Sequence, residues 1–275
     1  MGPSAATQIS VLKQFLAACE SYSIRPWFLQ ADLGTETPLV AAAQWQFVLS
    51  ANGKIRWNDQ TFTQGKRLRD CYKAAPSTKN IKIERWWEHM LHASSRAWVD
   101  YFGELARDGD FDSTMLEDRI ALAAVFEDLL HKKLFDFMAT WNFHDIRFQK
   151  NRPYIIHGKP YMNYHYPDTR KACNWGIQVD EAELKSLAEP LVDIDINSCL
   201  ESPTKEWCTK MLEGISINKV ILDNNQDPDR LQPYKRFYLG LHSKIIQHLQ
   251  QGQEPALAYR EVPRGGLERY VSQAF

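Results

Sequence analysis

The sequence predicts an α+β fold in which two long antiparallel helices and further helices pack with a small, mainly antiparallel sheet. Candidate strand pairs precede and follow a helical block instead of alternating with single helices, which disfavours a doubly wound parallel sheet. No repeat of fixed period occurs, which argues against solenoids and propellers. No change of composition marks a boundary, so we expect a disordered tail over residues 1–7 and a single globular domain over residues 8–275.

The first third of the chain predicts one helix and two strand regions. Apolar residues recur every three or four positions over residues 9–19, the spacing of an amphipathic helix. A strand is expected over residues 25–30. Apolar and polar residues then alternate from Trp45, and the alternation resumes after Asn52-Gly53, a pair that favours a tight turn. We therefore predict a β-hairpin over residues 45–57.

Two long helices are expected in the middle of the chain, over residues 81–107 and 114–142. Each has an apolar stripe when 100° is assigned to each residue. Ser113 or Thr114 can cap the second helix, and Glu117 falls in its first turn. A short connection joins the two helices, so we expect them to pack antiparallel.

The second half of the chain predicts one more hairpin, two strands and a last helix. The hairpin is expected over residues 154–166, around Gly158-Lys159-Pro160. The strands are expected over residues 191–196 and 217–222. Apolar residues from Tyr234 to Leu249 predict the final helix, which an irregular ending follows.

Charge, cysteine usage and hydropathy indicate a cytoplasmic protein. The 33 basic and 34 acidic residues give a net charge of −1, which argues against a histone-like or generally basic nucleic-acid coat. Five cysteines without a paired motif predict free thiols in a reducing compartment. The N-terminus has no secretory signal pattern, and no apolar run is long enough to span a membrane.

Several enzyme classes lack their motifs in this chain. There is no GxGxxG after a strand and no GxxxxGK[ST], so a Rossmann dinucleotide site and a P-loop are not expected. The sequence also has no GxSxG, no HExxH and no kinase signature set. The remaining candidates are constellations of residues rather than motifs.

The first candidate is a carboxylate beside an imidazole on one helix face, in Glu127 and His131. Glu127 falls within the apolar stripe of its helix, where a carboxylate must be paired, protonated or bound to something. A catalytic acid–base pair satisfies this requirement, and so does a structural pair. Glu88 and His92 have the same spacing, but His92 lies opposite the apolar stripe, which indicates a solvated pair.

The second candidate is a metal site at Asp193 and Asp195. Alternation along a strand would place both carboxylates on one face, where they could hold a divalent metal together with Asp223. A strand with a polar face toward solvent explains the same pattern without a metal.

The third candidate is the basic segment over residues 147–171, which holds six Lys or Arg against one acid, with five aromatic residues interleaved. Such a segment can contact phosphates and stack on bases, or it can hold an anionic substrate. Pairing of its cations with the acids at 180–183 is the alternative. The substrate-binding residues predicted here are Arg147, Lys150, Arg152, Tyr154, Lys159 and Tyr161.

The sequence favours an enzyme that acts on a small aromatic or anionic metabolite by acid–base chemistry. Glu127 and His131 would be the catalytic residues, with or without a divalent metal as cofactor. The competing interpretation is a protein that binds RNA or single-stranded nucleic acid through residues 147–171. A non-catalytic assembly subunit is a third interpretation.

Overall fold

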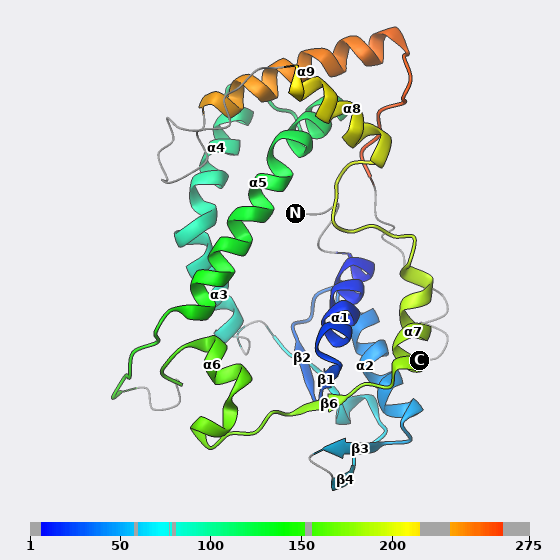
Figure 1. Cartoon of the computed structure of the whole chain (residues 1–275), viewed down its shortest axis with the longest axis vertical. Helices are drawn as coiled ribbons and strands as arrows, with labels where there is room; N and C mark the ends of the chain where they lie inside the picture. Colours follow the sequence, from blue (N-terminus) through cyan, green and yellow to red (C-terminus); the bar gives the residue numbers. More distant parts are fainter. Residues whose placement is uncertain are drawn as a thin grey trace. The chain divides into compact units, whose positions relative to one another are not determined.

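A computed structural model describes residues 7–57, 60–76, 78, 81–151, 156–214 and 232–260 (Figure 1). It confirms the α+β class, because helices dominate and the strands of these residues form three two-stranded sheets. No helix in the described ranges combines the length and hydropathy needed to cross a membrane. The elements in chain order are α1 (Gln8–Tyr22), β1 (Ile24–Pro26), β2 (Leu29–Ala31), α2 (Pro38–Ser50), β3 (Lys54–Trp57), β4 (Gln60–Thr63), η1 (Leu68–Asp70), β5 (Tyr72–Ala74), α3 (Ile81–Met90), η3 (Leu91–Ser95), α4 (Arg96–Arg107), α5 (Leu116–Phe143), α6 (Pro160–His165), η4 (Pro167–Arg170), β6 (Gly176–Gln178), α7 (Glu181–Ala188), η5 (Glu189–Leu191), α8 (Ser202–Glu213) and α9 (Gln232–Gln251).

The chain divides into two compact units. Unit 1 consists mainly of Trp86–Met138 and Asn197–Glu261, and unit 2 mainly of Ser4–Arg85 and Ala139–Ile196. The expectation of one domain over residues 8–275 stays a prediction. Thr7, which that expectation placed in a loose tail, caps α1 by accepting a hydrogen bond from the backbone N–H of Ser10 at 3.2 Å.

Unit 1 contains the predicted antiparallel helix pair. Trp98 on α4 packs against Phe126 on α5 with ring centroids 6.1 Å apart, and Trp86 packs against Phe137 at 5.7 Å. Residue numbers rise along one helix as they fall along the other, so the two helices run in opposite directions (Figure 1). The five-residue π-helix η3 interrupts the first helix between α3 and α4.

The last helix closes the core of unit 1, as its periodicity predicts. Tyr238 and Ile245 on α9 are fully buried beside Phe126 in one apolar cluster. The Tyr238 hydroxyl donates to the carboxylate of Asp118 at 2.6 Å, so the buried carboxylate of Asp118 has a partner.

Unit 2 is built on three helices. α1, α2 and α7 share an apolar cluster that includes Leu12, Phe47 and Leu187. β1 pairs antiparallel with β6, so that Arg25 lies opposite Ile177. This pairing brings the segment after α6 beside the end of α1, although about 150 residues separate them in the sequence.

The predicted hairpin over residues 45–57 is wrong in its first half. Residues 38–50 form helix α2, which starts at Pro38, a residue suited to the first helical turn. The alternating residues of this segment lie in a helix with few exposed positions, so alternation alone could not distinguish helix from strand. The turn is correct, since Asn52 and Gly53 both have positive φ, and β3 follows it.

The two later strand predictions are also corrected. Tyr161–Tyr166, expected as the second arm of a hairpin, is mainly helix α6, which Pro160 starts. Residues 191–196 leave the 3-10 helix η5 and continue as turn and coil, because Lys13 donates to the carbonyl oxygens of Leu191 and Ile194 in place of a strand partner. The strand predicted over residues 217–222 and the residue Asp223 lie outside the described residues.

Candidate nucleic-acid interface

A row of aromatic rings runs across unit 2 from the end of α5 to the end of α1. We call it the aromatic ladder, and its members in order are Phe143, Tyr161, His165, Tyr164 and Tyr22. Successive ring centroids are 5.0, 4.3, 5.1 and 5.9 Å apart. All five side chains are exposed. Rings that touch one another but stay open to solvent are available for stacking with a ligand.

Helix α6 sets the middle of the ladder. Tyr161, Tyr164 and His165 are three and four residues apart, so they share one face of the helix. Before the helix, the backbone N–H of Gly158 donates to the carbonyl of Ile146 at 2.8 Å, and the return bond is 3.1 Å. This short bridge ties the start of α6 to the chain that leaves α5, and it holds Tyr161 against Phe143.

Gly158 is required where it stands, because its backbone has a positive φ that residues with a Cβ rarely adopt. It has a φ of +91°, and a Cβ at this position would lie 2.4 Å from Nη2 of Arg170. The Arg170 side chain also donates from Nε to the side-chain oxygen of Asn163 at 3.2 Å, and its Nη1 lies 3.0 Å from Nε2 of His157. The guanidinium is therefore held beside α6 by Asn163 and His157.

Five exposed cations accompany the ladder, and none of them forms an ion pair within the described part of the chain. They are Arg147, Lys150, Lys159, Arg170 and Lys171. Two of the three acids that were expected to pair with them have other roles. Asp180 caps α7 by accepting from two backbone N–H groups, and Glu183 bonds to Ser50. The charges of these five cations are therefore not neutralised by ion pairs among the described residues.

The structure describes four of the six predicted binding residues. Arg147, Lys150, Lys159 and Tyr161 are all exposed in unit 2, whereas Arg152 and Tyr154 lie outside the described residues. Phe143 and Tyr22, the two end rings of the ladder, lie outside the predicted segment. Tyr22 is the more distant of the two in the sequence. No local pattern could have shown it, because its contact with Tyr164 depends on the pairing of β1 with β6.

The predicted catalytic pair lies in unit 1, where Glu127 has structural partners. Glu127 is 5% exposed. One oxygen accepts from the backbone N–H of Cys199 at 2.7 Å and the other from the hydroxyl of Ser198 at 3.1 Å. The carboxylate thus tethers the segment that leads into α8. A catalytic role for Glu127 with the half-buried His131 stays a prediction.

We expect Glu127→Gln to lower the free energy of unfolding by about 1–3 kcal/mol, because a neutral amide keeps one acceptor and sets an N–H₂ group against a donor. Urea unfolding followed by circular dichroism measures this change. Ser198→Ala removes one of the two tethering bonds and should have a smaller effect. If the Glu127→Gln variant kept wild-type stability but lost enzymatic activity, this result would instead support a catalytic role for Glu127.

Asp193 and Asp195, the predicted metal ligands, lie in irregular backbone. Asp193 is exposed in a turn, Asp195 is half-buried, and the strand that would have aligned them is absent. Glu88 and His92 are exposed, as the sequence indicates. Among the residues that the structure describes, no group of three or more His, Cys, Asp or Glu side chains could hold a metal ion.

Comparison with known proteins decides between the functional interpretations. A family model described as an integrase core domain matches residues 3–166, which is more than half of the chain. The chain belongs to this family. Comparisons with curated proteins and with solved structures find no match. An integrase core domain acts on nucleic acid, so the prediction of a small-metabolite acid–base enzyme is wrong, and the nucleic-acid alternative fits better.

Integrase core domains typically use divalent metal ions, and the residues described here do not fit such a site. A divalent ion needs several oxygen ligands that converge on one point, and neither predicted aspartate has the necessary neighbours in the described ranges. The assignment of Asp193 and Asp195 as ligands stays a prediction.

Proposed function

We propose that this integrase core domain binds a single strand of nucleic acid along the aromatic ladder and its five cations. The observation that carries the proposal is the exposed row of rings from Phe143 to Tyr22, flanked by cations without ion pairs in the described residues. The family supplies nucleic acid as the partner. The exposed rings favour a single strand over a duplex, and the rings and cations together define the surface that would bind it.

The cations suit a phosphate backbone. Lys150, Lys159 and Lys171 are exposed and have no acidic partner in the described chain, so binding a phosphate breaks no existing ion pair. Each phosphate contact releases condensed counterions, and this release drives binding that does not depend on base sequence. Arg170 is already held in place by Asn163, so less conformational freedom is lost when it binds.

The rings favour a single strand over a duplex. Bases in a duplex are stacked on one another and cannot lie on protein side chains, whereas bases of a single strand can. Stacking on an aromatic ring contributes about 1–3 kcal/mol for each base. Four of the five ladder members are Phe or Tyr, and all offer exposed ring surface, so the ladder can hold several bases in succession.

A salt titration tests the proposal. A fluorescently labelled 20-nucleotide single strand is titrated with the full chain at several salt concentrations, and anisotropy gives the dissociation constant. If each of the five described cations neutralises one phosphate, log K should fall with log salt with a slope of about −3.5, since single strands give about −0.7 for each contact. A duplex of the same sequence should bind more weakly. Absence of binding at low salt, or binding that salt does not change, would contradict the proposal.

A further inference from the structure

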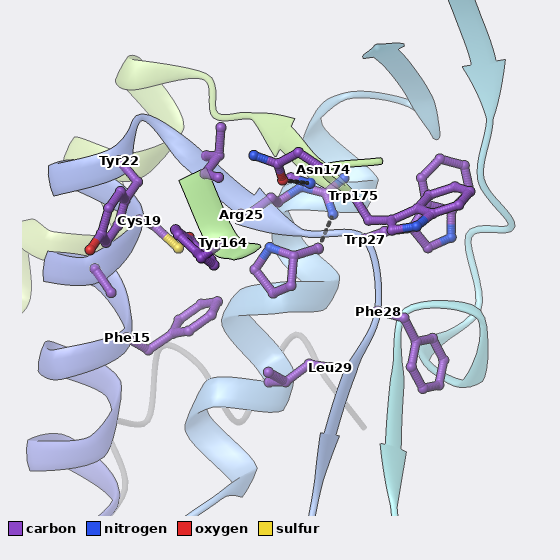
Figure 2. Close-up of a pocket in the computed structure, with 14 residues that line it drawn as sticks. Phe15, Cys19, Tyr22, Arg25, Trp27, Phe28, Leu29, Tyr164, Asn174 and Trp175 are labelled. Carbon is purple, nitrogen blue, oxygen red and sulfur yellow. Dashed lines mark hydrogen bonds between the residues drawn. The ribbon is translucent and has the colours of Figure 1, made fainter. Parts of the chain in front are cut away.

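A cavity opens at the end of the aromatic ladder in unit 2. Its volume is about 620 Å³, within the range of about 300–1,000 Å³ usual for pockets that take small molecules. It is lined by the end of α1, by residues 24–29, by Tyr164 and by residues 174–176 (Figure 2). Asn174 and Trp175 lie beyond the part of the chain that matches the family, so the match does not account for the whole pocket.

Aromatic rings form two sides of this cavity. Tyr22 and Tyr164 meet edge to face with centroids 5.9 Å apart, and Trp27 and Trp175 do so at 6.1 Å with an angle of 81° between the rings (Figure 2). Trp175 is 60% exposed and Tyr164 is 52% exposed, so large parts of their rings remain uncovered. The cavity is therefore suited to a flat, unsaturated group.

A buried cation lines the same cavity. Arg25 is 3% exposed, and its guanidinium donates to the carbonyl of Pro26 at 3.2 Å and to the side-chain oxygen of Gln64 at 3.3 Å. Both acceptors are neutral. Among the described residues no carboxylate pairs with Arg25, although a buried charge normally requires a partner of opposite sign.

The ionisable groups that interact with Arg25 cannot neutralise it. They are the thiols of Cys19 and Cys71, and burial raises the pKa of each thiol to about 11, so both stay neutral at pH 7. Burial lowers the pKa of the Arg25 guanidinium to about 10, which still leaves it charged at pH 7. The cavity thus combines aromatic walls with a positive charge that has no anionic partner in the described chain.

We propose that this cavity holds one nucleotide unit of the bound strand, with its base against Trp27 and Trp175 and its phosphate toward Arg25. The inference rests on the proposed function, since Tyr164 belongs both to the ladder and to the cavity wall. A strand that follows the ladder arrives at the cavity at Tyr164. A phosphate supplies the anion that Arg25 lacks, and a base stacks on the uncovered ring surface of the cavity wall.

The test uses tryptophan fluorescence of the full chain with AMP and with adenosine, and anisotropy with the labelled single strand. AMP should quench the fluorescence and should bind at least about tenfold more tightly than adenosine, because only AMP carries the phosphate. Arg25→Met should remove this difference. Trp175→Ala should lower the affinity for the single strand by about tenfold, the contribution of about one stacked base.

Two variants keep the result interpretable. Trp175 is exposed, so Trp175→Ala tests the cavity even if Arg25→Met fails to fold, and circular dichroism shows whether each variant folds. Trp87→Ala is the matched control, because Trp87 is an exposed tryptophan in unit 1, 48% accessible, and should leave both affinities unchanged.

The outcomes separate the cavity from the proposed function. If the wild-type chain and both cavity variants bind the single strand equally, and AMP does not quench, the inference is overturned while strand binding by the ladder stands. If AMP binding depends on Arg25 but the wild-type chain binds no single strand, the cavity binds free nucleotides. That result would overturn both the proposed function and the placement of a strand nucleotide in the cavity. Loss of strand affinity in Trp175→Ala, together with Arg25-dependent preference for AMP, supports the inference.

Discussion

Reversing three lysines, with Lys150→Glu, Lys159→Glu and Lys171→Glu together, should lower the affinity for a single strand by about 100-fold at moderate salt. Each lysine is exposed and lacks an acidic partner in the described chain, so the substitutions remove phosphate contacts and add repulsion. The slope of log K against log salt should become shallower by about 2, because three contacts of about 0.7 are lost. Fluorescence anisotropy measures both quantities.

The matched control reverses three cations of unit 1 and changes the net charge by the same amount. Arg96, Arg107 and Lys205 each pair with an acid at 3.3 to 3.8 Å on the surface. Exposed ion pairs contribute at most about 1 kcal/mol, so the control variant should fold and should bind like the wild-type chain. Equal losses in the two triple variants would show that only net charge matters, and the surface assignment would then be wrong.

The long helices could be predicted from the sequence because their periodicity extends over many turns. α5 covers 28 residues, and α9 buries Tyr238, Leu241 and Ile245 at the expected spacing. Helix α2 could not be distinguished in this way. It has 13 residues, less than half the length of α5. Leu39, Ala43 and Phe47 are buried on one side, and Gln44 and Val48 are buried on another. Its sequence therefore has no clear polar face.

Burial of Glu127 was predictable from its place in the apolar stripe, but its partners were not. Ser198 and Cys199 lie about 70 residues further along the chain, and only tertiary packing brings their donors to the carboxylate. A buried carboxylate is equally compatible with catalysis and with tethering when only the sequence is known. In the structure, the donors from Ser198 and Cys199 satisfy both carboxylate oxygens, so tethering alone accounts for the burial of Glu127.

The binding surface was predictable in part, for a similar reason. Residues 147–171 stand out by composition, and the five described cations of this segment are exposed. The cavity draws on residues near position 25 and near position 175, which come together through the pairing of β1 with β6. Neither stretch contains a motif, so the sequence does not indicate that Arg25 and Trp175 line the same cavity.

Removing two rings of the ladder, with Phe143→Ala and Tyr161→Ala, should lower the affinity for a single strand by about 10- to 100-fold. The two rings stack on each other with centroids 5.0 Å apart and an angle of 26° between their planes, and Phe143 is 55% exposed. Loss of stacking with one or two bases, at about 1–3 kcal/mol for each, accounts for an effect of this size. Both rings lie outside the cavity lining, so the result is independent of the nucleotide pocket.

The salt dependence separates this loss from the loss caused by charge reversal. The substitutions at Phe143 and Tyr161 remove no cation, so the slope of log K against log salt should stay at the wild-type value although the affinity falls. Affinity for a duplex should change much less, since its bases are not available for stacking on the rings. The control replaces Trp87 and Phe135, two exposed aromatic residues of unit 1, with alanine and should bind normally. If the ladder variant instead changed the slope, or weakened duplex and single-strand binding equally, the rings would act by positioning the cations and not by stacking with bases.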